Sequence, residues 1–296
     1  MSFRILALFL GLSLVAHAGL LKPDVDFANY DVPLHEQIVN HIKARILARL
    51  GEGKSVRDRY FIIPLAYENH GNDPEFSHSF LSVVRVLADV SQARLTHGLK
   101  KQTYKNREFE AFTISWLPHD FMVNPNLCVF RPPSSEITPA KNTCPLSKGR
   151  NFNLEETIKL AVNVKNAVVM WGPYEIRKEG FDLGVKRMRL LDKGTIRYRA
   201  DDRLYRKDKI AINCFHAISG LDELFPDGGL FGTGFNIWGI NGTARVLREY
   251  TNKAKYKGLL LEPVDVKKDR YGFVYAPTRN GHGLFNPVRN ASAYRR

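Results

Sequence analysis

The sequence predicts an α+β fold in which a small, mostly antiparallel sheet packs against helices. Two observations lead to this prediction: segments with helical periodicity alternate with a few β-rich segments, and no break in composition divides the chain. Its 296 residues are 44% hydrophobic and 11% aromatic, which is typical of a globular protein with a sizeable core. We therefore expect residues 19–296 to form a single domain, with a basic, loosely held tail from about residue 267.

The helices are indicated by apolar spacing and by capping residues. A helix is predicted over 33–50, where Ile38, Ile42 and Ile46 recur every four residues and two glycines follow. Asn153 is the expected N-cap of a second helix that runs through residue 160. Further helices are predicted over 181–191, from Asn213 through residue 224, and over 244–252.

The strands are indicated by β-branched and aromatic runs. They are predicted over 60–67, 79–87, 108–117 and 167–171, with a last one over 257–261. The polar stretch 88–107 fits either a hairpin extension or a helix. The stretch 118–150, which holds six prolines, is expected to be irregular.

Residues 1–18 have the layout of a secretory signal peptide. Arg4 precedes an apolar run over 5–15, and Ala16 and Ala18 stand where a signal peptidase requires small residues. The alternative is a membrane anchor, but a helix needs about 20 apolar residues to cross a bilayer. The sequence therefore predicts a secreted or periplasmic protein with no transmembrane segment in the mature chain.

The charge balance indicates the kind of partner. The formal net charge is +14, and the Lys and Arg residues are scattered rather than gathered in one block. In an exported protein such an excess favours an anionic envelope polymer or a lipid over nucleic acid, or it only solvates the surface. No cofactor or metal is predicted, since even His35 and His41 lie six residues apart and share no helix face. The sequence indicates no oligomeric state.

The three cysteines are Cys128, Cys144 and Cys214. In an exported chain, Cys128 and Cys144 are expected to form a disulfide that closes a loop rich in Pro and Ser. Closing such a loop stabilises a fold by about 3 kcal/mol. Cys214 then remains as the free thiol.

Cys214 is the candidate nucleophile. Asn213 can cap the helix that follows, which places Cys214 in its first turn, where a thiolate is favoured. The alternative is a buried cysteine that packs as a small hydrophobic residue.

A thiol nucleophile needs a histidine base, which a third group usually orients. We favour His78, which stands at the start of the second predicted strand. His216 lies two residues after Cys214 and points away from it in a helix, so a packed or supporting role is expected. His119, at the end of the third predicted strand, is a further candidate for the base. If the second and third strands pair antiparallel, Thr113, Ser115 or His119 lies near His78, and we choose Ser115 as the orienting group.

These motifs resemble the circularly permuted papain-like cysteine hydrolases. The similar features are a strand that opens with His78, a following strand with a polar end, a helix and loop up to Tyr198, and Asn213-Cys214-Phe215-His216. That superfamily includes lecithin:retinol acyltransferase-like proteins and relatives of bacterial cell-wall peptidases. The resemblance covers roughly 76–120 and 178–224, and it departs from the pattern in the long gap between the second and third strands.

The resemblance implies a permuted papain-like fold with Cys214 as the nucleophile and His78 as the base. It implies an exported peptidase, amidase or acyl-ester hydrolase that acts on cell-envelope material. The alternative is a non-catalytic envelope-binding protein with the same fold.

Overall fold

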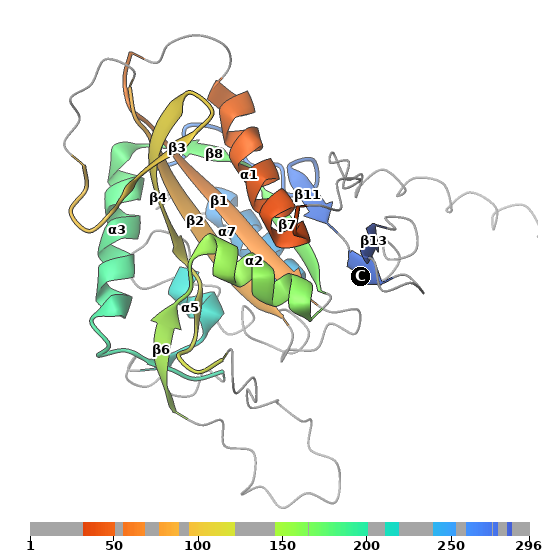
Figure 1. Ribbon diagram of the computed structural model, residues 1–296. Coiled ribbons are helices and arrows are strands. Elements are labelled where there is room, and N and C mark those ends of the chain that lie inside the picture. Colours follow the sequence, from red (N-terminus) through yellow and green to blue (C-terminus); the bar gives the residue numbers. More distant parts are fainter. Residues whose placement is uncertain are drawn as a thin grey trace, which may run out of the picture.

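The computed structural model shows a mixed α+β fold with few helices and mostly antiparallel sheets, as the sequence predicts (Figure 1). The residues that it describes are 32–50, 56–68, 77–88, 95–121, 146–164, 166–200, 211–218, 239–252, 259–273, 275–277 and 283–285.

The main sheet has seven strands in the order β11-β7-β1-β2-β4-β3, and β8 also pairs with β1. Every pairing in this sheet is antiparallel. The strands are β1 (Arg59–Glu68), β2 (His78–Val86), β3 (Lys101–Tyr104), β4 (Arg107–Ile114), β7 (Ala167–Trp171), β8 (Tyr174–Ile176) and β11 (Arg270–Phe273).

A second sheet of shorter strands continues from the end of β4. It has the order β10-β9-β6-β5, and its β9 and β10 are parallel. The strands are β5 (Trp116–Pro118), β6 (Ser147–Asn151), β9 (Arg197–Tyr198) and β10 (Ala211–Ile212). A separate antiparallel pair is formed by β12 (Tyr275–Pro277) and β13 (Gly283–Phe285).

Helices cover both faces of the main sheet. They are α1 (Leu34–Leu50), α2 (Leu154–Asn163), α3 (Lys178–Asp192), α5 (Cys214–Ile218) and α7 (Gly239–Asn252). Phe61 and Ile63 of β1 belong to a core with α1 and α2, whereas Ile62 belongs to a core with α3, α5 and α7. In Figure 1, α1 and α2 cross the near face and α7 lies behind the sheet. Because both faces are covered, β1 is a continuous apolar run rather than an alternating one.

Several boundaries differ from the sequence-based expectation. Part of the ambiguous stretch forms β3, which pairs with β4 through a turn at Lys105, so the hairpin alternative is correct there. The helix predicted from residue 244 already begins at Gly239. Leu260 makes a single bridge to Ile176 where a last strand was expected. Within the predicted loose tail, β11 pairs with β7 at the edge of the main sheet.

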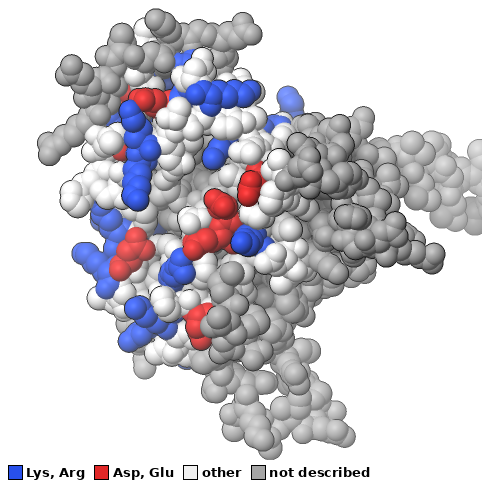
Figure 2. Space-filling model, viewed as in Figure 1, with Lys and Arg blue, Asp and Glu red and all other residues white. Residues whose placement is uncertain are grey.

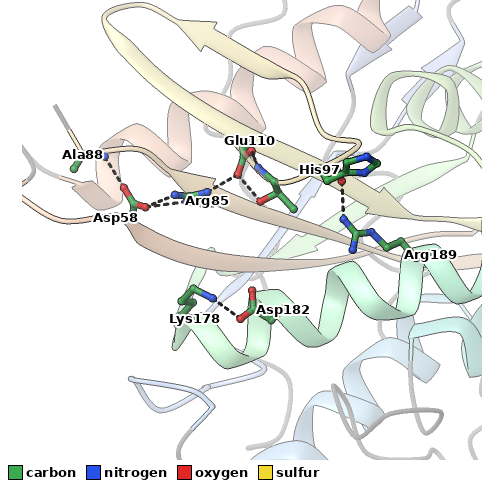
Figure 3. A network of polar contacts seen from close by, with 9 residues as sticks. Asp58, Arg85, Ala88, His97, Glu110, Lys178, Asp182 and Arg189 are labelled. Carbon is green, nitrogen blue, oxygen red and sulfur yellow. Dashed lines mark hydrogen bonds and ion pairs between the residues drawn. The ribbon is translucent and has the colours of Figure 1, made fainter. Parts of the chain in front are cut away.

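A network of charged side chains anchors the segment before β3 (Figure 3). Arg85 donates to Asp58 at 2.6 Å and to Glu110 at 3.0 Å. Glu110 is fully buried and also accepts hydrogen bonds from the backbone N–H and the hydroxyl of Thr96. The buried carboxylate is thus paired with a cation and hydrogen-bonded, as a buried charge must be.

Candidate functional site

The register of β2 and β4 brings His78 and Ser115 together. The strands pair antiparallel with Leu81 opposite Ile114, so the residue after β4 lies beside the start of β2. His78 Nε2 is 2.9 Å from Ser115 Oγ, and both residues are buried. The structure therefore places Ser115 where the sequence predicts the orienting group.

The imidazole of His78 is enclosed by aromatic rings. It stacks on Phe80 with ring centroids 5.5 Å apart, and the Tyr67 ring lies 5.3 Å from it. Burial lowers the pKa of His78 to about 3, because a charged imidazolium would lose its hydration there. The ring is therefore neutral near pH 7. Its Nδ1 is buried and has no hydrogen-bond partner among the residues that the structure describes.

Asn213 caps α5, as the sequence predicts. Its Oδ1 accepts the backbone N–H groups of Phe215 at 3.0 Å and His216 at 3.1 Å. Its Nδ2 donates to the carbonyl of Ala200 at 3.1 Å, which ties the start of α5 to the end of β9. Cys214 is the first residue of this five-residue helix, and its thiol is free.

The thiol of Cys214 does not have the lowered pKa expected at a helix start. Cys214 is partly exposed, yet desolvation of its sulfur raises the pKa to about 11, although backbone hydrogen bonds from Ser79, Phe215 and Cys214 itself oppose that rise. The helix is short, and the side chain of Asn213 already accepts two of its first N–H groups. Desolvation therefore outweighs the helix terminus, and the resting group is a thiol.

The sulfur of Cys214 lies beside the start of β2. The backbone of Ser79, the residue after His78, hydrogen-bonds to it. Burial raises the pKa of both Tyr67 and Tyr198, and the Cys214 thiolate, once it forms at high pH, raises both pKa values further. Since Tyr67 also packs on the His78 ring, the thiol and the imidazole adjoin the same tyrosine, but no hydrogen bond joins His78 Nδ1 to the sulfur.

The hydroxyl of Thr157, which the sequence did not indicate, extends the series of polar contacts that begins with His78 and Ser115. Thr157 of α2 lies with its Oγ1 2.8 Å from Ser115 Oγ and 2.8 Å from the backbone carbonyl of Asn153. Asn153 is the N-cap of α2, as the sequence predicts, and Glu156 completes a capping box with it. A threonine inside a predicted helix gives no signal of such a contact, because the contact depends on how α2 packs on the sheet.

The two alternative histidines lie elsewhere. His119 is exposed, and its backbone N–H donates to the carbonyl of Lys148 at 2.8 Å. His216 is buried in α5, and its carbonyl accepts a hydrogen bond from Arg187 at 3.2 Å. These positions favour structural roles for both.

Cys128, Cys144 and the signal peptide over 1–18 lie outside the described residues. The disulfide and the cleavage remain predictions.

A second buried carboxylate lies at the end of β1. Glu68 is 2% exposed and accepts the backbone N–H of Ile240, at the start of α7, at 2.9 Å. Burial raises its pKa to about 7, although the charge of Arg270 partly opposes that rise. Gly239 has φ of 56°, and a Cβ there would lie 2.8 Å from Glu68 Oε2. The glycine thus permits the close approach of α7 to this carboxylate.

The described residues offer neither a metal site nor a membrane-spanning helix. Within the described ranges, no group of three or more His, Cys, Asp and Glu side chains is placed to hold a metal ion. None of the helices described is both long and apolar enough to cross a membrane.

On the face in Figure 2, Lys and Arg are interspersed with Asp and Glu, so no single basic patch dominates that face.

Comparisons with known proteins give no family for this chain. No protein-family model matches it, and no curated protein or solved structure matches it significantly.

Proposed function

We propose that this chain is an exported thiol hydrolase that cleaves amide or ester bonds, with Cys214 as nucleophile and His78 as general base. One observation carries the proposal: His78 Nε2 and Ser115 Oγ are 2.9 Å apart. The backbone of Ser79, the next residue after His78, also hydrogen-bonds to the Cys214 sulfur. Nucleophile, base and orienting group are the parts of a papain-like site. A circularly permuted papain-like arrangement belongs to the same proposal.

The reaction starts from a neutral thiol and a neutral imidazole. As the Cys214 sulfur bonds to the substrate carbonyl carbon, its proton passes to His78 Nδ1. The tetrahedral intermediate then expels an amine or alcohol, which takes that proton. Water attacks the thioester, again through His78, and releases the carboxylic acid with the thiol restored. Asn213 occupies the N–H groups of Phe215 and His216. The N–H of Cys214, which contacts its own sulfur in the resting protein, is therefore the donor that turns to the oxyanion at this helix start.

The substrate class follows from export and charge. A net charge of +14 on a chain with a signal peptide favours an anionic envelope polymer or lipid. Figure 2 shows mixed charges on one face, so the proposed attraction does not depend on a basic patch among the residues described on that face.

The second candidate is a non-catalytic envelope-binding protein with the same fold. The raised pKa of Cys214, about 11, favours it, because a desolvated and protonated thiol can be an inert packing residue. The two candidates differ in whether Cys214 can be acylated.

The test uses a p-nitrophenyl ester as an activated acyl donor, near neutral pH. We expect the mature protein to release nitrophenolate in a burst, Cys214→Ala to show no burst, and His78→Gln to slow it by about 10²-fold or more. His97→Gln is the matched control, because His97 is exposed and only its carbonyl contacts Arg189 (Figure 3). A wild type without a burst, or a burst that persists in Cys214→Ala, supports the non-catalytic candidate.

A further inference from the structure

We propose that Thr157 is a positioning residue that sets the tautomer of His78 through Ser115. It keeps the imidazole proton on Nε2 and leaves the lone pair on Nδ1. The inference rests on the proposed role of His78 as the base, but the tautomer can be measured without any turnover.

Three short contacts form one buried chain from His78 to the backbone of α2. His78 Nε2 is 2.9 Å from Ser115 Oγ, which is 2.8 Å from Thr157 Oγ1. Thr157 Oγ1 is in turn 2.8 Å from the carbonyl oxygen of Asn153. The side chains of His78, Ser115 and Thr157 are at most 1% exposed, so bulk water does not compete for these contacts.

The last group of the chain determines the direction of every hydrogen bond in it. Thr157 Oγ1 is placed to donate to both Ser115 Oγ and the Asn153 carbonyl, but its hydroxyl has a single proton. A carbonyl oxygen only accepts, whereas a serine hydroxyl can also donate, so the Thr157 proton points to Asn153. Ser115 must then donate its proton to Thr157, and its oxygen accepts from His78. All three contacts are hydrogen bonds only if Nε2 carries the imidazole proton.

With the hydrogen bonds in the opposite direction, fewer of these polar groups have a partner. If Thr157 donated to Ser115, and Ser115 to Nε2, the Thr157 and Asn153 oxygens would face each other at 2.8 Å without a proton between them. The imidazole proton would then lie on Nδ1, which is buried and has no hydrogen-bond partner among the described residues. A buried N–H without a partner is more costly than an unused lone pair. The forward chain is therefore favoured.

The tautomer matters because a base needs a lone pair. With the proton on Nε2, Nδ1 is the nitrogen that can accept the Cys214 proton, and the imidazolium still donates to Ser115. Thr157 acts only through Ser115 and contacts no substrate. Its hydroxyl should affect the tautomer and the acylation rate but not the identity of the nucleophile.

The test is long-range proton–nitrogen NMR of protein labelled with ¹⁵N-histidine, which distinguishes the two tautomers of His78. We expect the Nε2–H form in the wild type and in Thr157→Ser, which keeps the hydroxyl. Thr157→Val keeps the shape but frees Ser115 to donate to Nε2, so the Nδ1–H form should appear. Acylation by the nitrophenyl ester should then slow by about tenfold or more. Thr113→Val is the control, because Thr113 pairs with Ser82 at 2.9 Å in a separate hydroxyl pair.

Two results would overturn the proposed role of Thr157: a predominant Nδ1–H form of His78 in the wild type, or an unchanged His78 spectrum in folded Thr157→Val. If Thr157→Val does not fold, Ser115→Ala tests the same chain, and an unchanged tautomer there counts against it equally. If Cys214 is acylated while His78 is in the Nδ1–H form, only the proposed role of Thr157 is rejected. The expected tautomer without any acylation rejects only the proposed hydrolase.

Discussion

The protonated state of Cys214 should appear directly in the pH dependence of its alkylation by iodoacetamide. Its pKa is about 11, against an ordinary value of 9.0, so near neutral pH its thiolate fraction is about 100-fold below that of an exposed cysteine. A more basic thiolate is a stronger nucleophile. With a Brønsted coefficient of about 0.45, a pKa that is two units higher makes the thiolate about eightfold more reactive. Cys214 should therefore react about tenfold more slowly than a free cysteine.

The assay follows the peptide that contains Cys214 by mass spectrometry over a pH series, beside a cysteine model peptide. The rate should still rise above pH 9, with its midpoint near pH 11 and its plateau above that pH. The midpoint does not depend on how accessible the sulfur is. His78→Gln should leave the midpoint unchanged, because a neutral imidazole adds no charge. A rate that levels off near neutral pH, and loses that plateau in His78→Gln, would refute the reasoning by revealing a thiolate–imidazolium pair.

Two further predictions concern the buried carboxylates. Glu68→Gln should stabilise the protein by about 3 kcal/mol at pH 8 and by little near pH 4.5, as measured by urea unfolding, because the amide can still accept the N–H of Ile240 without a buried charge. Glu110→Gln should cost about 1–3 kcal/mol and speed hydrogen exchange at the Thr96 amide, because Arg85 and Thr96 lose a charged acceptor.

The sign for Glu68 follows from its raised pKa. The folded state binds its proton more tightly than the unfolded state, so this contribution to stability is complete below about pH 4.5 and is lost as pH rises through about 7. His78 acts in the opposite direction: its pKa falls to about 3, so its contribution is present above about pH 6.5 and is lost as pH falls. The difference between wild type and Glu68→Gln isolates Glu68. A difference that is constant from pH 5 to pH 8 would contradict the assignment.

The control for Glu110→Gln is Glu108→Gln. Glu108 pairs with Lys101 at 2.7 Å, but both side chains are nearly half exposed. Exposed pairs contribute little, so Glu108→Gln should leave both stability and the exchange of Thr96 close to wild type. Equal effects of the two variants would show that burial of Glu110 is not what matters.

The sequence predicted those features of the fold and site that follow from local pattern and strand pairing. Apolar spacing located α1, and cap chemistry located the starts of α2 and α5 at Asn153 and Asn213. The contact of His78 with Ser115 was predicted because an antiparallel pair places one strand's end beside the other's start. These inferences need only neighbours in sequence or one pairing rule.

The remaining features depend on packing between distant segments. The partner of Ser115 on α2, the approach of Gly239 to Glu68 and the edge strand β11 each join residues far apart in sequence. The thiol pKa was predicted in the wrong direction because helix-end electrostatics is visible in the sequence, whereas the desolvation of the Cys214 sulfur is not. Desolvation is a property of the whole fold, and here it is the larger effect.

The most direct test of the proposed hydrolase is to locate the acyl group on the protein itself. The mature chain is mixed with the nitrophenyl ester, stopped in acid during the burst, digested and mapped by mass spectrometry. We predict one acyl group, attached as a thioester to the peptide that contains Cys214, and its absence in His78→Gln at the same time point. An acyl group found only on lysines, or on Cys214 equally in wild type and His78→Gln, would contradict catalysis by this pair.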